Sequence, residues 1–366
     1  MKKEQKLLYN KEIQDHFFAR LRSEANDIVT KTSSKYRKEI VLKAFLFPAL
    51  YFSCWIVAML YSAETSAVLF TGYLAMGLLV VLNYLNVVHD AVHNTIFKSR
   101  RLNKLYIYLF DIMGANSFIW KTRHVLFHHN YPNVNGWDTD IDQSALVKIV
   151  PRAPSSKLHK YQHMYLPFIY PLFLFNWLLI RDFKDFFSRQ RIVHKKIDIP
   201  FIEYLKLFFF KGLFFTYMLL LPVFVFHIAW KKAVVAFVLM IFTASIAALT
   251  VLLPPHANTG SEFPEPDKNR KLPHGWFMHM LKTTNDVNGE NWLTRFMLGN
   301  FNYHIVHHLF PNIHHSYYPH ITEKLKQISI ENNLPYRSYS IGTSLKMHYQ
   351  LLKKNSSDFN IWEEDM

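Results

Sequence analysis

The chain has 366 residues, half of them hydrophobic and 16% aromatic, which excludes a disordered polar chain. Its formal charge of +15 is typical of a nucleic-acid-binding protein, of a protein on an anionic membrane surface, or of basic cytoplasmic membrane loops. The single cysteine, Cys54, excludes intramolecular disulfides and cysteine-ligated iron–sulfur clusters, whereas the 20 histidines are enough for metal binding through imidazole.

The first predicted elements are helices. Residues 1–40 are charged and helical in pattern, and we expect a cytoplasmic helical segment there. Four apolar runs follow, each of about the 20 residues that a helix needs to cross a bilayer. They form two pairs with short links, 43–62 with 66–86 and 207–227 with 232–253. The sequence therefore predicts an all-α integral membrane protein with four transmembrane helices in two hairpins.

Shorter segments lie between and after these runs. The stretches 104–119 and 166–180 are apolar but too short to span, which favours helices in or near the membrane interface. Lys211 sits near one end of its run, where a lysine can extend its amine to the lipid headgroups. We expect one membrane domain over residues 41–330 and a cytoplasmic tail over residues 331–366.

Positive charge is distributed unevenly around the apolar runs. The hairpin links contain few basic residues apart from Lys231 and Lys232. The N-terminal segment, the 87–206 loop and the chain beyond residue 253 contain nearly all the others. By the positive-inside rule, both termini and the long loop are expected to be cytoplasmic. This bias explains most of the charge, so we expect no nucleic-acid partner.

Three histidine clusters lie in the segments predicted to be cytoplasmic. Their members are His89, His93, His124, His128, His129, His304, His307 and His308. Each cluster contains two histidines four residues apart, and on a helix such residues share a face and can point to one place. Eight imidazoles exceed the three or four ligands that zinc usually takes and are enough for two metal ions. Iron, copper, zinc and nickel all accept imidazole, and a site without cysteine favours iron.

The context of these clusters resembles the membrane fatty acid desaturase family. WKTRHVLFHHNYPNVNGWDTDID, residues 120–142, is similar to the family stretch W…HN..HH…N..G.D.DI, and GNFNYHIVHHLFP, residues 299–311, is similar to GG.N.Q.EHHLFP. The resemblance covers residues 40–330 and implies a di-iron centre held in a cytoplasmic helical cap. It also implies use of O2 as co-substrate and introduction of a cis double bond into a fatty acyl chain.

Further site residues are expected around the clusters. The family usually adds a histidine between the fourth span and the third cluster, and His256 stands there as a ninth ligand. Candidates to orient ligand histidines by hydrogen bonding, with solvated turns as the alternative, are Asp90, Asp138, Asp140, Asp142, Asn285 and Asn302. Trp120 and Trp276 could line the acyl site, although anchoring at the membrane interface is the favoured interpretation. His279 and His315 are the other histidines expected to support the ligands.

The expected partners follow from the same resemblance. The acyl chain could be carried by CoA, by acyl carrier protein or by a glycerolipid. Electrons would come from a separate donor, such as a ferredoxin or cytochrome b5 with its reductase, because the HPGG haem motif of a fused cytochrome b5 domain is absent. Phosphates or an acidic donor could be bound by Lys98, Arg100, Arg101, Lys121 and Arg123, which the positive-inside bias also explains.

Two other functions stay open on the sequence alone. A lipid hydroxylase, ketolase or epoxygenase of the same di-iron fold shares the hydrogen-abstraction step, and the HHLFP context favours desaturation over these. A non-catalytic membrane metal carrier would need polar residues within its spans, and the four apolar runs contain almost none. Regioselectivity is also open, because His304 and Val306 stand where many front-end desaturases carry glutamine and glutamate.

Overall fold

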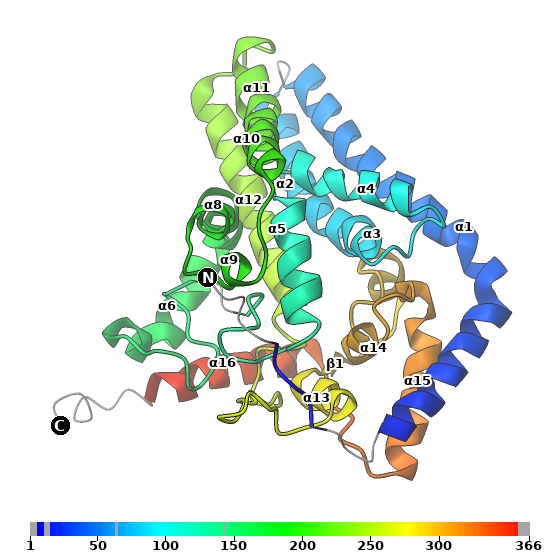
Figure 1. The fold of residues 1–366 in the computed structure, drawn as a ribbon. Coiled ribbons are helices and arrows are strands. Elements are labelled where there is room, and N and C mark those ends of the chain that lie inside the picture. Colours follow the sequence, from blue (N-terminus) through cyan, green and yellow to red (C-terminus); the bar gives the residue numbers. More distant parts are fainter. Residues whose placement is uncertain (1–5, 11–14, 63–64, 142–143, 358–366) are drawn as a thin grey trace.

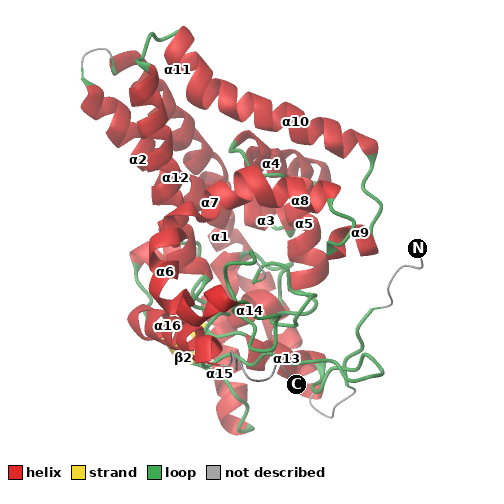
Figure 2. Ribbon diagram, turned by 90° about the vertical axis from the view of Figure 1, so that its left-hand side faces the viewer, coloured by secondary structure: helices red, strands yellow, loops and turns green. Residues whose placement is uncertain are grey.

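The computed structural model describes residues 6–10, 15–62, 65–141 and 144–357, and nearly all of their regular structure is helical. The α-helices are α1 (Asp15–Tyr61), α2 (Ser66–Asn83), α3 (His89–Val92), α4 (Arg100–Ile112), α5 (Ser117–Lys121), α6 (Gln162–Ile169), α7 (Phe173–Asn176), α8 (Asp182–Phe187), α9 (Ile192–Lys196), α10 (Phe201–Phe215), α11 (Leu221–Phe224), α12 (Trp230–Leu252), α13 (Trp276–Thr283), α14 (His304–Leu309), α15 (Tyr318–Glu331) and α16 (Ile341–Ser357). The longer helices α2, α10 and α12 gather at one end of the molecule, and α13 to α16 lie at the other (Figures 1 and 2).

Short π-helical and 3-10 turns continue or connect several of these helices. The π-helical turns are η1 (Tyr84–Val88), η2 (Thr122–His128), η5 (Trp177–Arg181), η6 (Thr216–Leu220) and η7 (Leu293–Met297), and the 3-10 turns are η3 (Lys157–Tyr161), η4 (Tyr170–Leu172) and η8 (His315–Tyr317). Two short strands, β1 (Asp286–Val287) and β2 (Ser338–Tyr339), pair in parallel. The described residues thus form a helical protein with one minimal sheet.

Five helical segments are long and apolar enough to cross a membrane, which indicates an integral membrane protein. They are His16–Tyr61, Ser66–Val92, Lys157–Lys196, Phe201–Phe224 and Trp230–Leu252. Four of them coincide with the four predicted runs to within three residues at the ends where a run extends beyond its segment. The fifth contains residues 166–180, which we expected to form only a short interfacial helix. The observed segment is longer because η3, α6, η4, α7, η5 and α8 follow one another end to end.

Helix α1 is far longer than the apolar run that it contains. Its 47 residues give a length of about 70 Å at 1.5 Å per residue, more than twice the hydrocarbon core of a bilayer. It runs without a break across residue 40, where we expected the membrane domain to begin. The charged first half of α1 contacts α15, where Arg20 forms an ion pair of 2.8 Å with Glu331.

The apolar helices pack closely around α2, which lies between α1 and α12. A side chain at Gly77 would meet the backbone of α12, since its Cβ would stand 2.5 Å from the carbonyl oxygen of Met240. Small residues permit this kind of close helix approach within a membrane. The Asn83 amide, fully buried, donates hydrogen bonds to the carbonyls of Phe47 and Leu79, which ties α2 to α1.

Candidate metal centre

The nine histidines predicted as ligands come together in the structure as two groups. The first group contains His89, His93, His124, His129 and His307, and the second contains His128, His256, His304 and His308. Within each group, one ring nitrogen of every member lies within 4.8 Å of those of all the others. All nine residues are at most 7% exposed. Donors from four separate segments of the chain therefore converge on two adjacent points.

The second and third sequence clusters are each divided between the two groups, contrary to the expectation that each cluster points to one place. His124 and His128 lie in η2, where backbone hydrogen bonds join residues five apart, as from His129 N–H to His124 O. This wider turn brings His124 and His129 into the first group and sends His128 to the second. On α14, His304 and His308 share the second group, while His307 joins the first.

The distances between these imidazoles fit shared metal ions. The Nε2 atom of His256 lies 2.9 Å from that of His304 and 3.0 Å from that of His308. Likewise, the Nε2 atoms of His89 and His307 are 3.1 Å apart. One imidazole proton cannot satisfy all of these contacts, whereas two nitrogens bound at right angles to one ion at about 2.1 Å stand about 3 Å apart. His93 Nε2 is buried without a hydrogen-bond partner among the described residues, as expected for a free donor.

Burial also sets the charge state of the centre. Desolvation, reinforced by repulsion between neighbouring imidazoles, lowers the pKa well below its ordinary value at His93, His124, His129, His304, His307 and His308. The same desolvation lowers the pKa of His256 to about 3. Burial opposes protonation of His128 as well, but the adjoining Asp138 carboxylate outweighs it and raises that pKa. Most of the imidazoles are therefore neutral near neutral pH, with one ring nitrogen free to bind a metal.

Two of the predicted aspartates orient histidines of η2. Asp138 accepts hydrogen bonds from His128 Nδ1 at 3.0 Å and from the backbone N–H groups of Asn133 and Asp140. Asp138 is 1% exposed, so the alternative of a solvated turn does not describe it. Asp140 accepts a bond of 3.0 Å from His124 Nδ1. Both contacts leave Nε2 directed to the centre, as outer-sphere carboxylates do for metal-binding histidines.

The other predicted supporting residues lie elsewhere in the network. Asp90 pairs with His315 Nδ1 at 2.7 Å and with His314 at 3.3 Å. Asn285 donates to Ser261 and to the carbonyl of Pro255, next to His256, and His279 lies 2.9 Å from the carbonyl of Pro132. The side-chain oxygen of Asn302 has no partner among the described residues, Trp276 packs edge-on against Phe18, and Asp142 lies outside the described part of the chain.

Sequence reasoning missed two residues that hold the centre together. The Asn133 amide lies within 3.2 Å of the carbonyls of His256, Glu262 and Thr283, so it joins the second histidine cluster to the chain around the ninth histidine. The backbone of Asn133 has a φ of 60°, a left-handed conformation that asparagine tolerates better than most residues do. Tyr318 places its hydroxyl 3.1 Å from His307 Nδ1, and only the fold brings them together.

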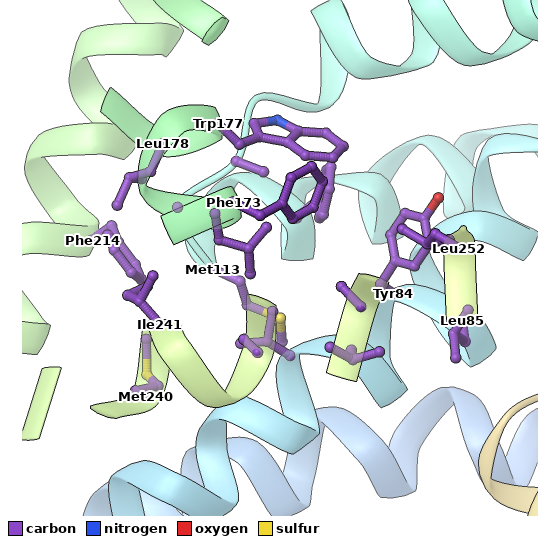
Figure 3. A pocket seen from close by; sticks show the side chains of 18 of the residues that line it. Tyr84, Leu85, Met113, Phe173, Trp177, Leu178, Phe214, Met240, Ile241 and Leu252 are labelled. Carbon is purple, nitrogen blue, oxygen red and sulfur yellow. The ribbon is translucent and has the colours of Figure 1, made fainter. Parts of the chain in front are cut away.

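One cavity adjoins the centre, and a second, apolar cavity lies next to it. The histidine cavity is bordered by Trp120 and by four of the nine histidines, His124, His128, His256 and His304. The apolar cavity lies between α2, α4, η5, α10 and α12. The two share Tyr84, Phe173, Trp177 and Leu252 as walls. In Figure 3 the apolar cavity extends from Tyr84 and Leu252 on one side to Met240 and Ile241 on the other.

Trp120 is a wall of the histidine cavity and not an anchor at the membrane interface. Its side chain is fully buried, whereas an interfacial anchor would present its ring to the headgroups. The indole stacks on His124 at a centroid distance of 5.0 Å and an interplanar angle of 19°. The ring therefore limits the space beside a candidate ligand.

A buried ion network supports the wall of the apolar cavity. Arg123, one of the candidates to bind phosphates or an acidic donor, is fully buried and forms an ion pair of 2.5 Å with Asp185. Lys211, which we expected at the headgroups, is 5% exposed and donates to Asp182 at 2.8 Å and to the carbonyl of Gly114 at 2.7 Å. Neither side chain reaches the place suggested for it, because the fold supplies internal acceptors that sequence spacing does not reveal.

Replacing Asp138 with asparagine is expected to weaken metal binding by about 10- to 100-fold, since the amide no longer holds His128 as a carboxylate does. Metal content after dialysis against a graded chelator series would measure this loss. Asp267→Asn is the matched control, because Asp267 is exposed and bonds only the backbone of its own turn. Equal metal retention by the Asp138 variant and the control would contradict the assigned role.

Comparison with known proteins agrees with this geometry. Residues 64–340 match the fatty acid desaturase family. The sn-1 linoleoyl-lipid 6-desaturase of Arthrospira platensis is 30% identical over 286 residues, which cover 78% of this chain and 77% of that protein. The acyl-lipid (8-3)-desaturase of Physcomitrium patens is 27% identical over 328 residues, covering 88% and 68%. The sn-1 linoleoyl-lipid 6-desaturase of Synechocystis sp. is 25% identical over 322 residues, covering 87% and 88%.

Proposed function

This chain belongs to the fatty acid desaturase family, and from that premise we propose that it binds two iron ions and desaturates an acyl chain esterified to a membrane lipid. The observation that carries the proposal is the division of nine buried histidines into two groups of donors. Iron suits a site of imidazole nitrogens without thiolates. The names of the relatives in Arthrospira and Physcomitrium favour a lipid-bound substrate over a free acid.

Each part of the site has a role in this reaction. The bound iron pair would supply O2 activation, which no side chain of the protein can provide. The chain itself holds most of the imidazoles neutral, fixes two of them through Asp138 and Asp140, and keeps water from the centre by burial. The apolar cavity would hold the chain beyond the reacting carbons, so the register between cavity and centre would set the position of the new double bond.

We also propose that both termini and the centre face the cytoplasm, with four membrane crossings. The fifth long segment, Lys157–Lys196, contains Arg181 and Asp185 among its buried residues. Arg181 donates to the carbonyl of Thr139, and Asp185 pairs with Arg123 beside the centre. These contacts support a segment that lies along the centre and does not cross. A separate cytoplasmic donor, such as a ferredoxin or cytochrome b5, would then reach the centre.

Expression in a host with a simple lipid profile tests this function. Gas chromatography–mass spectrometry of the fatty acids should show a new alkene, whose position gives the regiochemistry. Separation of the lipid classes before hydrolysis should show the new chain first in intact glycerolipids. A hydroxylated or keto product without a new alkene would contradict desaturation, and product confined to the acyl-CoA pool would contradict the lipid-bound substrate.

Enlarging Ile241 is expected to shorten the acyl chain that the enzyme accepts. Ile241 is 5% exposed and lies at the far side of the apolar cavity from Tyr84 (Figure 3). In Ile241→Phe, the added volume should lower the ratio of long to short products at least about tenfold, the scale of discrimination by a methylene or more. Val235→Phe on the same helix is the control, since Val235 is 49% exposed and lies outside the cavity. An unchanged product profile in Ile241→Phe would argue that the acyl chain lies elsewhere.

A further inference from the structure

The C-terminal helix α16 presents a row of apolar side chains on its surface. Ile341, Leu345 and Tyr349 are 43%, 37% and 44% exposed, and we call these three residues the α16 stripe. They stand four residues apart, so they lie along one face of the helix. Lys353 continues the same row, Lys346 lies beside it, and both are exposed. An apolar face bordered by lysines is typical of a helix that lies in the plane of a membrane surface.

A neighbouring face of α16 is fixed to the body of the protein. His348 donates from Nδ1 to the carbonyl of Ala257 at 2.6 Å, and its Nε2 lies 2.5 Å from the hydroxyl of Tyr170. One turn and a half further along, the Asn355 amide donates to the carbonyl of Ile149 at 2.6 Å. Both His348 and Asn355 are buried. These bonds set the rotation of α16 about its axis, so the α16 stripe is held outward.

The α16 stripe lies at the level where the long apolar helix α12 ends. Leu345 and Tyr349 line one cavity together with Ile246 and Thr250 of α12, and both of these α12 residues are exposed. The 23 residues of α12 extend about 35 Å, close to the roughly 30 Å thickness of a hydrocarbon core. Its last two turns, which contain Ile246 and Thr250, therefore stand within about 10 Å of one edge of that core. The α16 stripe stands beside them.

Helix α6 extends the same apolar surface. It packs against α16 near the end of α12 (Figure 2). Its side chains Met164 and Phe168, again four residues apart, are 60% and 82% exposed, and Pro167 lines the cavity that Leu345 also lines. Two helices that are far apart in sequence thus form one exposed apolar surface. A contiguous surface of this kind marks an interaction site.

We propose that α16 lies in the membrane interface and inserts the α16 stripe among the acyl chains of the bilayer. The occupant is membrane lipid, because the stripe continues the surface that α12 turns outward where it ends. Lys346 and Lys353 would then extend their amines to the headgroups. Residues 331–366, which we expected to be a cytoplasmic tail, would thereby contain a segment attached to the membrane. The inference depends on membrane integration and not on the reaction proposed above.

The seat of α16 also bears on the second histidine group. Ala257, whose carbonyl accepts from His348, directly follows His256 in the chain. The contact joins a helix at the membrane surface to the backbone beside a candidate ligand. Insertion of the α16 stripe would therefore help to fix the depth of that histidine group relative to the bilayer.

Fluorescence quenching in lipid nanodiscs tests the position of the α16 stripe. Cys54→Ser removes the single native cysteine, and Leu345→Cys, Tyr349→Cys or Gln350→Cys then supplies one site for the fluorophore NBD. Gln350 is the matched control, since it is exposed on α16 and lies outside the cavity. The metal-loaded full chain is placed in phosphatidylcholine and phosphatidylglycerol, with a phosphatidylcholine that carries a nitroxide near the top of one acyl chain. Emission from positions 345 and 349 should be mostly lost, and emission from position 350 should be mostly kept.

Iodide in the water gives the reverse comparison. It should quench NBD at position 350 strongly and at positions 345 and 349 weakly. Equal quenching by the nitroxide lipid at all three positions, or equal access of iodide, would overturn the proposal. Protection of positions 345 and 349 from both quenchers would also overturn it, because a protein surface, such as a second copy of the chain, would then cover the stripe.

A charge placed on the stripe tests the same seat by a second route. Leu345→Glu, added to the chain labelled at position 349, should raise the access of iodide to the fluorophore, because a carboxylate resists insertion among acyl chains. Gln350→Glu in the same background is the control and should leave that access unchanged. If the chain labelled at position 349 does not fold, Ile341→Cys carries the label on the same face. Unchanged iodide access in Leu345→Glu would contradict an inserted stripe.

Discussion

Alanine at His256 is expected to lower alkene formation by more than about a hundredfold, beyond the effect of losing a residue that only orients a ligand. His256 Nε2 lies within 3.0 Å of the Nε2 atoms of His304 and His308, so its removal opens one side of the second histidine group. The first group does not include His256. The variant should therefore retain about half of its iron, because metal affinity depends on the number of ligands in place. Iron per chain by mass spectrometry and product by gas chromatography would measure both effects.

A second histidine separates ligand loss from the general effect of removing an imidazole. His163 is half-buried, lies outside both groups and bonds through Nδ1 to Ser356 Oγ at 3.2 Å. His163→Ala should keep its iron and most of its activity. Full iron content and full activity in His256→Ala would show that His256 is not a metal ligand of the centre. That result would leave the other eight histidines as the candidate ligands.

The substitution Arg123→Met is expected to prevent stable folding. The substitution leaves Asp185 and Asp182 buried beside each other with less positive charge to balance them. Breaking a buried ion pair by removing one partner costs about 3–5 kcal/mol, a large part of the stability of a typical domain. Thermal unfolding in detergent, followed by intrinsic fluorescence, should show a strongly lowered midpoint or no folded protein.

An exposed arginine in an ion pair gives the matched control for Arg123. Arg152 pairs with Glu265 at 2.6 Å, but its side chain is 79% exposed. Arg152→Met should change stability by less than about 1 kcal/mol, as exposed pairs usually do. The double variant Arg123→Met with Asp185→Leu should recover part of the lost stability, since it removes both charges. Equal midpoints for Arg123→Met and Arg152→Met would show that the buried network does not stabilise the fold.

Much of the architecture was readable from the sequence because membrane insertion and metal binding leave local patterns. Apolar length predicted four of the five long helices, and the family resemblance is confirmed by the match over residues 64–340. The fifth segment was not predicted as a long helix because its length comes from several short helices in series, one of which contains Pro167. The apolar content of a short stretch of sequence does not reveal that several short helices join into one long segment.

The internal arrangement of the site could be predicted only in part. Clustering identified nine histidines that the structure brings together, while their ligand role stays a proposal. The division of the second cluster between the two groups depends on the π-helical geometry of η2, which the sequence of that segment does not indicate. The partners of Lys211 and Arg123 lie 29 and 62 residues away in the chain, so a local pattern cannot reveal them. Long-range contacts thus decide which charged residues face inward.

The spacing of the histidines along the chain also bears on how the protein matures. His89 and His307 lie 218 residues apart in sequence, yet their Nε2 atoms stand 3.1 Å apart. Contacts between such distant segments form late in folding, because closing the long loop between them costs entropy before the contacts can stabilise the fold. These two histidines therefore meet only after α3 and α14 have come together, so an ion that both of them bind would enter a largely folded chain. If the centre holds iron, as we propose, a cell short of iron would accumulate folded enzyme without its metal and not unfolded chain.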